Sequence, residues 1–106
     1  MSLNLGEKTV TKPWLKSYPE GIPAEIDLDA YSSIVDIFHQ SCHANRERTA
    51  YLNFDRAITF GELERLSRDY AAWLQSRGMR KGERIAQMMP NILQNPTALF
   101  CALRPG

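Results

Sequence analysis

The strongest pattern in this sequence runs from Thr59 to Gly78 and reads TFGELERLSRDYAAWLQSRG. Thr59 and Glu62 have the spacing of a capping box, in which each side chain accepts a backbone N–H that the first helical turn leaves free. Apolar residues then recur at helical spacing, namely Leu63, Leu66, Tyr70, Trp73 and Leu74. Opposite charges stand four residues apart in the pairs Glu64–Arg68 and Arg65–Asp69. With Gly78 as its stop, the segment predicts an amphipathic helix.

The segment before this helix predicts another one. Ser32 or Ser33 can cap a helix of about three turns that ends near Asn45. Asp36 follows Ser33 by three residues and would lie near the positive end of the helix dipole. The apolar face of this helix would consist of Ile34, Phe38 and Cys42.

Three short strands are expected around the strong helix. Residues 50–54 and 56–59 flank Asp55 and have the composition of a hairpin. Residues 85–89, IAQMM, read as a buried strand. Pro90 would end this strand, because proline has no N–H to donate to a sheet.

A last helix is expected to follow. Asn91 or Asn95 can cap it, it would run to about Leu103, and Pro96 is tolerated only in its first turn. A strand followed by a crossover helix normally leads into another parallel strand, which this sequence does not contain. We therefore expect an α/β fold of about three helices and three short strands, forming an incomplete piece of a larger domain.

Residues 1–30 show no sustained periodicity and are expected to form an extended arm. Its breakers are Pro13, Pro19, Gly21 and Pro23. Its larger apolar residues are Trp14, Leu15, Tyr18 and Ile22. We expect the arm to lie along a surface of this chain or of another, with free mobility as the alternative. A membrane contact through Trp14 and Tyr18 is the weaker interpretation, because the neighbouring Lys12 and Lys16 would give little attraction to anionic headgroups.

Length and charge narrow the class of protein. The 106 residues, 12.1 kDa, suit one domain, and 43% hydrophobic with 24% charged residues argue against collagen-like, coiled-coil and disordered classes. A formal charge of +1 argues against a dedicated nucleic-acid binder. The longest apolar run, residues 98–103, is far shorter than the ~20 residues of a membrane span, and no secretory signal is recognisable. We therefore expect a cytoplasmic protein.

His39 and His43 stand four residues apart and would share one helix face. Two-histidine zinc sites use this spacing, but a solvated face is the favoured interpretation because no third ligand except Cys42 is near. Cys42 could act as a nucleophile beside these histidines, or pack as a small hydrophobic residue, which the apolar stripe favours. Cys101 lies in an apolar run and is also interpreted as buried. The two cysteines lack the spacing of a disulfide framework.

Loops that bind phosphate are rich in glycine, and neither common glycine motif occurs here. The segment from Gly78 to Gly82 follows a helix and precedes a strand, the reverse of a nucleotide loop. The basic residues Arg77, Arg80, Lys81 and Arg84 are interpreted as a solvated rim. Residues 88–91, MMPN, sit at the edge where open α/β sheets place ligands, with core packing and capping as the favoured alternative. We assign no catalytic, cofactor-binding or metal-binding residue.

Several segments carry patterns of one enzyme family. They are residues 14–19 (WLKSYP), 31–38 (YSSIVDIF), 58–63 (ITFGEL), 81–86 (KGERIA), 88–94 (MMPNILQ) and 98–100 (ALF) with Leu103-Arg104. From Trp14 to Gly106 the chain resembles the N-terminal region of bacterial long-chain fatty-acid–CoA ligases, members of the adenylate-forming, AMP-binding superfamily. The patterns at 58–63 and 81–86 are superfamily-wide, whereas the arm and the MMPN run point to the fatty-acid branch. Pro105 departs from the small residue usual at its position.

The resemblance implies a two-step reaction for the parent enzyme. ATP and a fatty acid give an acyl-adenylate and pyrophosphate, with magnesium assisting, and coenzyme A then takes the acyl group as AMP leaves. Residues 31–106 would begin the AMP-binding N-terminal domain, and the family's phosphate loop, adenine-binding and catalytic motifs would follow Gly106. The 106-residue chain alone is therefore expected to be inactive and to bind none of ATP, magnesium or coenzyme A.

The resemblance also implies partners for the parent enzyme. It implies a fatty acid as substrate and no nucleic acid. It leaves open a peripheral association with membranes and a homodimer formed through the N-terminal arm. The competing hypothesis is a stand-alone, non-enzymatic interaction or dimerisation module on a small α/β scaffold.

Overall fold

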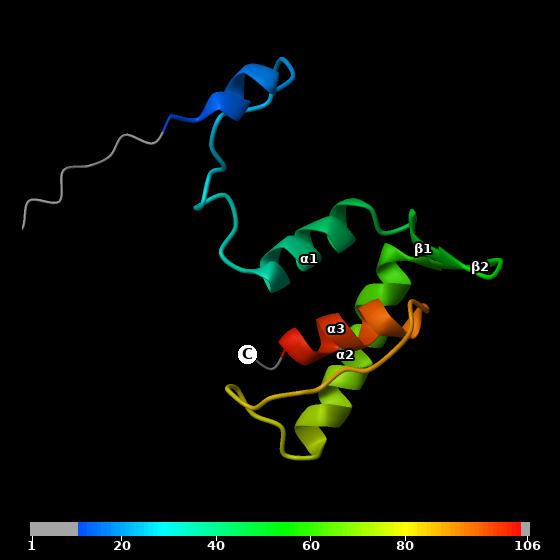
Figure 1. Cartoon of the computed structure of the whole chain (residues 1–106). Helices are drawn as coiled ribbons and strands as arrows, with labels where there is room; N and C mark the ends of the chain where they lie inside the picture. The colour runs from blue at the N-terminus through cyan, green and yellow to red at the C-terminus, as the bar shows by residue number, and fades with distance from the viewer. Residues whose placement is uncertain (1–10, 105–106) are drawn as a thin grey trace, which may run out of the picture.

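The computed structural model describes residues 11–104 and centres on a long helix, α2 (Phe60–Ser76). The other elements are the 3₁₀ helix η1 (Pro13–Ser17), helix α1 (Ile34–Ala44), strands β1 (Thr49–Asn53) and β2 (Arg56–Thr59), and helix α3 (Gln94–Leu103). Helices α1 and α3 both pack on α2, and the two strands form one antiparallel hairpin at its N-terminal end (Figure 1). The expected mixed α/β class is confirmed.

Helix α2 begins with the capping box that the sequence predicts. The Glu62 N–H donates to Thr59 Oγ1 at 3.1 Å, and the Thr59 N–H donates to the Glu62 carboxylate at 2.9 Å. Both bonds satisfy donors that a helix start leaves without intrahelical partners. Gly78 follows the last turn with a φ of +91°, a conformation that residues with a Cβ rarely adopt.

We expect Thr59→Ala to lower the free energy of unfolding by about 1 kcal/mol, because it leaves a helix N–H without its acceptor. Urea denaturation followed by circular dichroism measures this loss. Thr11→Ala, a change of the same chemistry on the exposed arm, serves as the control and should leave the midpoint unchanged. Equal effects of the two substitutions would contradict the role of the cap.

The same capping box makes stability depend on pH. Hydrogen bonds from Thr59 lower the pKa of the Glu62 carboxyl below its ordinary value. A carboxyl with a lowered pKa in the folded state stabilises the fold above its ordinary pKa, and this stabilisation is lost as the pH falls through the lowered value. Glu62→Gln should remove this part of the acid dependence, so the difference in unfolding midpoint between the two proteins should shrink on acidification.

The buried line of α2 consists of Leu63, Ser67 and Ala71. The expected apolar stripe therefore matches the buried face at Leu63. Further along the helix it does not, because Tyr70 and Trp73 are 39% and 49% exposed. The small side chains at positions 67 and 71 leave room for α3, the helix that makes the most extensive contact with α2. Packing against a second helix, rather than apolar character alone, decides which face is buried.

Helix α1 has one of the two expected caps and two of the three residues expected on its buried face. Ser33 is the cap, and its Oγ accepts the Asp36 N–H at 3.0 Å. Phe38 and Cys42 are buried, whereas Ile34 in the first turn is 62% exposed. Together with Ile58 of β2 and Leu63 of α2, these two residues form the hydrophobic core.

Strands β1 and β2 confirm the predicted hairpin within one residue at either end of β1. Phe54 and Asp55 form its two-residue turn, with φ of +45° and +62°. Two successive positive φ values are typical of the tight turns that match the twist of paired strands. Phe54 is 90% exposed at the tip of the hairpin.

The third expected strand, residues 85–89, is not formed. This segment has no regular secondary structure, and within it Met88 is 98% exposed. A central parallel strand is stable only between neighbouring strands, and the part of the chain that the structure describes offers it none. The prediction of a buried strand was therefore wrong for residues 11–104.

The last helix begins between the two expected positions and without a side-chain cap. Leu93 is its N-cap residue, so the predicted caps Asn91 and Asn95 are both wrong. Pro96 lies in the first turn, as expected, where its missing N–H has no intrahelical acceptor to satisfy.

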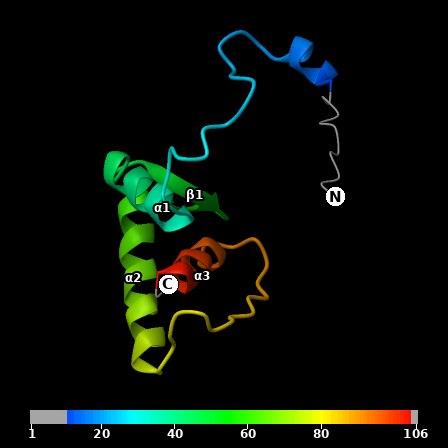
Figure 2. The same cartoon turned by 90° about the vertical axis from the view of Figure 1, so that its left-hand side faces the viewer.

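Residues 11–30 of the expected arm stand apart from the helices in both views (Figures 1 and 2). Trp14 and Tyr18 are 49% and 41% exposed, so the structure does not place these aromatic rings on the hydrophobic core. The radius of gyration, 19.8 Å, exceeds the roughly 13 Å of a compact domain of this length. Residues 1–10 of the expected arm lie outside the described residues. Within residues 11–104, no helix has the length and apolar character needed to cross a membrane.

Candidate functional site

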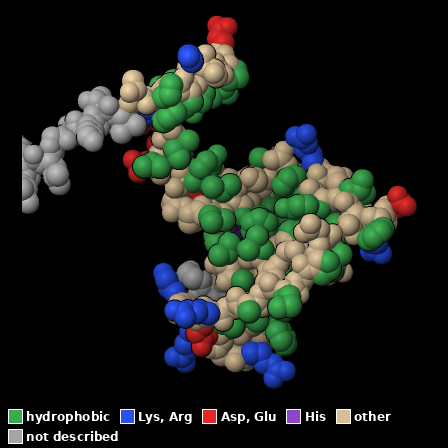
Figure 3. Space-filling model, in the orientation of Figure 1, with side chains coloured by type: hydrophobic (Ala, Val, Ile, Leu, Met, Phe, Trp, Pro, Cys, Tyr) green, Lys and Arg blue, Asp and Glu red, His purple; other side chains and the backbone are tan. Residues whose placement is uncertain are grey.

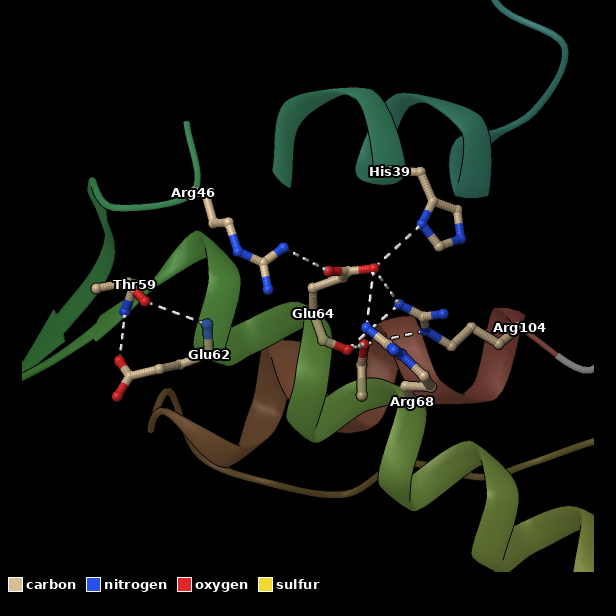
Figure 4. Close-up of polar contacts among 8 residues, drawn as sticks. His39, Arg46, Thr59, Glu62, Glu64, Arg68 and Arg104 are labelled. Atoms are coloured by element: carbon tan, nitrogen blue, oxygen red, sulfur yellow. Dashed lines mark hydrogen bonds and ion pairs between the residues drawn. The ribbon is translucent and has the colours of Figure 1, made fainter. Parts of the chain in front are cut away.

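The most concentrated polar arrangement surrounds the carboxylate of Glu64 on α2 (Figure 4). We call it the Glu64 cluster, and its members are His39, Arg46, Glu64, Arg68 and Arg104. The carboxylate lies 3.3 Å from Arg68 Nη2, 3.5 Å from Arg46 Nη1 and 3.9 Å from Arg104 Nη2. His39 Nδ1 is 3.8 Å away. One side chain of α2 thus connects α1, the turn after α1 and the end of α3.

Arg104 is the least exposed of the three arginines in this cluster. Its side chain is 12% exposed, and its guanidinium donates to Ser67 Oγ at 3.0 Å and to the Glu64 carbonyl at 3.3 Å. The guanidinium also lies 5.5 Å from the centre of the Phe38 ring. Burial lowers the pKa of Arg104, and the Glu64 carboxylate opposes this shift. These contacts hold the end of α3 against α2.

The two histidines that share a face of α1 lie beside the Glu64 cluster. With Arg46, Glu64 and Arg68, His39 and His43 line an open hollow of about 450 Å³. No group of three His, Cys, Asp or Glu side chains suited to a metal ion occurs within residues 11–104. The histidine pair therefore lies on a partly solvated face beside one carboxylate and two guanidiniums. These surroundings agree with the favoured interpretation of a solvated face over a zinc site.

Both cysteines are packed in the interior. Cys42 and Cys101 are each 1% exposed and carry free thiols. Burial raises the pKa of both thiols, which disfavours the thiolate that a nucleophile needs. The interpretation of both residues as small hydrophobic side chains is confirmed.

Residues 88–91, which sequence reasoning placed at a possible ligand edge, are held by Asn95. The Asn95 amide donates to the carbonyl of Pro90 at 3.1 Å and to that of Met89 at 3.4 Å. Gln87 in turn donates to the Asn95 carbonyl at 3.0 Å. Asn95 thus fixes the chain leading into α3 from within the first turn, instead of capping the helix.

The segment from Gly78 to Gly82 is a plain connection after α2. Both glycines have positive φ, +91° and +90°, as turns require. Arg77 lies over the Trp73 ring at 5.5 Å, and Arg80 and Arg84 are exposed. This geometry agrees with the interpretation as a turn with a solvated basic rim.

Sequence reasoning found one contact of the Glu64 cluster and missed the others. The Glu64–Arg68 pair follows from helical spacing, and the structure confirms it. Arg46 and Arg104 lie 18 and 40 residues from Glu64 along the chain, and no local pattern connects them with it. The polar groups that the structure brings together are ion pairs and helix caps rather than a nucleophile held by a base. Chemically, the cluster can hold helices together and present positive charge.

Comparisons with a family model and with known proteins point to the same enzyme family. Residues 38–106 match the family described as AMP-binding enzyme. Over 96 residues, 90% of this chain, the sequence is 48% identical to the long-chain-fatty-acid–CoA ligase of Yersinia pestis and 43% identical to that of Haemophilus influenzae. The Bacillus subtilis ligase is 33% identical over 95 residues. The chain spans 17% of the length of these relatives. No solved structure matches the chain.

Proposed function

This chain belongs to the AMP-binding enzyme family, and we propose that it forms the opening part of the N-terminal domain of a long-chain fatty-acid–CoA ligase. The observation that carries this proposal is 48% identity over 90% of the chain to a relative named for that activity. Residues 31–106 then begin the domain, and the family match from residue 38 supports this boundary. Residues 1–30 form an arm that precedes it.

The reaction of the proposed parent enzyme joins a fatty acid to coenzyme A at the expense of ATP. Adenylation turns the carboxylate oxygen, a poor leaving group, into AMP, a good one. Cations such as magnesium and backbone N–H groups stabilise phosphate charge in reactions of this kind. Within residues 11–104 no group of three His, Cys, Asp or Glu side chains is suited to hold a metal ion. The role of this part of the chain is to supply a packed layer of helices to the domain.

The exposed arm supports a proposal about partners. Trp14 and Tyr18 are 49% and 41% exposed on the arm, and this apolar surface favours contact with a second copy of the protein through the arm. Peripheral association with a membrane is the alternative, and the parent enzyme would act in the cytoplasm in either case. Sedimentation of the parent enzyme with and without residues 1–30 distinguishes a dimer formed by the arm from a monomer.

A chimeric enzyme tests the proposed function. The chain replaces the matching 96 residues of the Yersinia pestis ligase, and acyl-CoA formation from ATP, a long-chain fatty acid and coenzyme A is measured. We expect the chimera to be active, because 48% of the aligned positions are identical. The ligase lacking the segment altogether is the control and should be inactive.

A chimera that folds but makes no acyl-CoA would contradict the proposal and favour the second candidate, a stand-alone interaction module. The 106-residue chain by itself should not produce acyl-CoA. Production of acyl-CoA by the purified chain would show that it is more than the opening part of a domain.

A further inference from the structure

The hollow beside the Glu64 cluster carries more positive than negative charge. The residues that line the hollow include two guanidiniums, those of Arg46 and Arg68, and one carboxylate, that of Glu64, so positive charges exceed negative ones by one. The Glu64 side chain is 17% exposed, and the Arg46 and Arg68 side chains are each 58% exposed. The excess charge is therefore on the open side of the cluster, where a solute can reach it.

The donors of these two exposed arginines are not used. Their distances to the Glu64 carboxylate, 3.3 and 3.5 Å, belong to loose ion pairs. Within residues 11–104 neither the Arg46 nor the Arg68 guanidinium donates a hydrogen bond, in contrast to Arg104. A guanidinium has five N–H donors in a planar fork that matches the oxygens of a phosphate.

The hollow has the size and the walls for such a group. Its volume is about 450 Å³, and its walls come from α1, from the turn after α1 and from α2. His39 and His43 line it from α1, opposite the arginines of α2 and the turn. Each imidazole can donate a further hydrogen bond to an oxyanion. Guanidinium and imidazole donors thus line one open space, and Glu64 supplies the only carboxylate among its lining residues.

We infer that this hollow binds a phosphate group, held by Arg46 and Arg68 with His39 and His43 as additional donors. This inference goes beyond the proposed function and does not depend on it. A metal ion is disfavoured by the arginines, and a singly charged carboxylate would use only part of the donor set. A phosphate group offers several oxygens to this donor set, and its negative charge matches the excess positive charge of the lining.

Titration with inorganic phosphate tests the inference on the 106-residue chain. Binding is followed by the ring NMR signals of His39 and His43, which report from inside the hollow. We expect saturable shifts that weaken as sodium chloride is added, because exposed charges are screened by salt. Absence of saturable shifts at either histidine would overturn the inference.

Variants assign the binding to named side chains. Arg46→Gln and Arg68→Gln should each weaken phosphate binding about fivefold, the loss of one unit charge near the ligand in water. Arg84→Gln is the matched control, because it removes the same charge from an exposed loop outside the hollow. It should change the affinity by less than about twofold. Equal weakening by all three variants would show unspecific attraction and overturn the site.

Glu64→Gln separates ligand binding from a structural role of the cluster. Removing this carboxylate should tighten phosphate binding about fivefold, because it takes away the one repulsive charge. A cluster that serves only to hold helices together predicts no gain, so weaker or unchanged binding in folded Glu64→Gln would contradict the inference.

The source of the phosphate is tested in a separate arm. Vesicles of phosphatidylglycerol and of neutral phosphatidylcholine are compared in flotation experiments. A lipid source would be supported by three results together. The protein binds the anionic vesicles, inorganic phosphate competes with this binding, and substitution of Arg46 or Arg68 abolishes it. Binding of inorganic phosphate without vesicle binding would support a soluble phosphate ester.

Discussion

Replacing Phe38 with alanine is expected to lower the free energy of unfolding by about 3–5 kcal/mol, the usual range for a buried phenylalanine. The Phe38 side chain is 5% exposed, and its ring stacks on that of Phe100 with 4.0 Å between ring centres (Figure 1 shows α1 and α3 side by side). Arg104 lies over the same ring at 5.5 Å. The substitution therefore removes the contact that joins α1 to α3 as well as core volume.

The size of this effect relative to total stability follows from how small the core is. Few hydrophobic residues are buried within residues 11–104, and the central cluster consists of four of them, Phe38, Cys42, Ile58 and Leu63. The space-filling view shows extensive apolar surface exposed along the helices and the arm (Figure 3). Domains of this size are stable by only about 5–15 kcal/mol, and a sparse core places this chain at the lower end. Phe38→Ala should thus leave a large fraction of molecules unfolded.

Urea denaturation followed by circular dichroism measures the loss, and Phe54→Ala is the matched control. Phe54 is also a phenylalanine but is 90% exposed at the hairpin tip. Its removal should change the free energy of unfolding by less than about 0.5 kcal/mol. If both variants lost similar stability, the core would not lie where the structure places it.

The parts of the fold that local rules determine were predictable from the sequence. The capping box of Thr59 and Glu62 lies within four consecutive residues, and the structure confirms both of its hydrogen bonds. The hairpin around Asp55 is equally local, although Phe54, which was expected in the first strand, belongs to its turn. In each case the partners are close in the chain, so the pattern alone brings them together.

Long-range packing accounts for what the sequence did not predict. Residues 85–89 have the composition of a buried strand, but a strand needs a neighbour, and composition does not show whether one is present. The apolar stripe of α2 was misplaced for a related reason, because Ser67 is buried by the approach of Arg104 and α3. Local propensity does not contain this information.

The candidate site divides in the same way. The histidine spacing on α1 and the Glu64–Arg68 pair were visible in the sequence, whereas the meeting of α1, α2 and Arg104 required the fold. Helix packing brings several guanidiniums to the one carboxylate of Glu64. For this reason sequence reasoning assigned no binding residue, and the hollow that we propose as a phosphate site includes the histidines whose face was interpreted as solvated.

Arg104→Met is expected to lower the free energy of unfolding by about 3 kcal/mol, because it removes the buried partner of groups that water cannot reach freely. Ser67 Oγ is fully buried and accepts from Arg104, and the Glu64 carbonyl accepts a second hydrogen bond. Methionine keeps most of the volume of the side chain, so the loss measures charge and hydrogen bonding rather than a cavity.

The control for this prediction acts on the same carboxylate from the outside. Arg68 lies closer to Glu64 than Arg104 does, 3.3 against 3.9 Å, but its side chain is 58% rather than 12% exposed. Arg68→Met should therefore cost less than about 1 kcal/mol, and added salt should reduce this cost further. If proximity decided the strength of these pairs, Arg68→Met would be the more damaging substitution. The opposite order, measured by urea denaturation at two salt concentrations, would show that burial of the guanidinium and its hydrogen bonds hold α3 against α2.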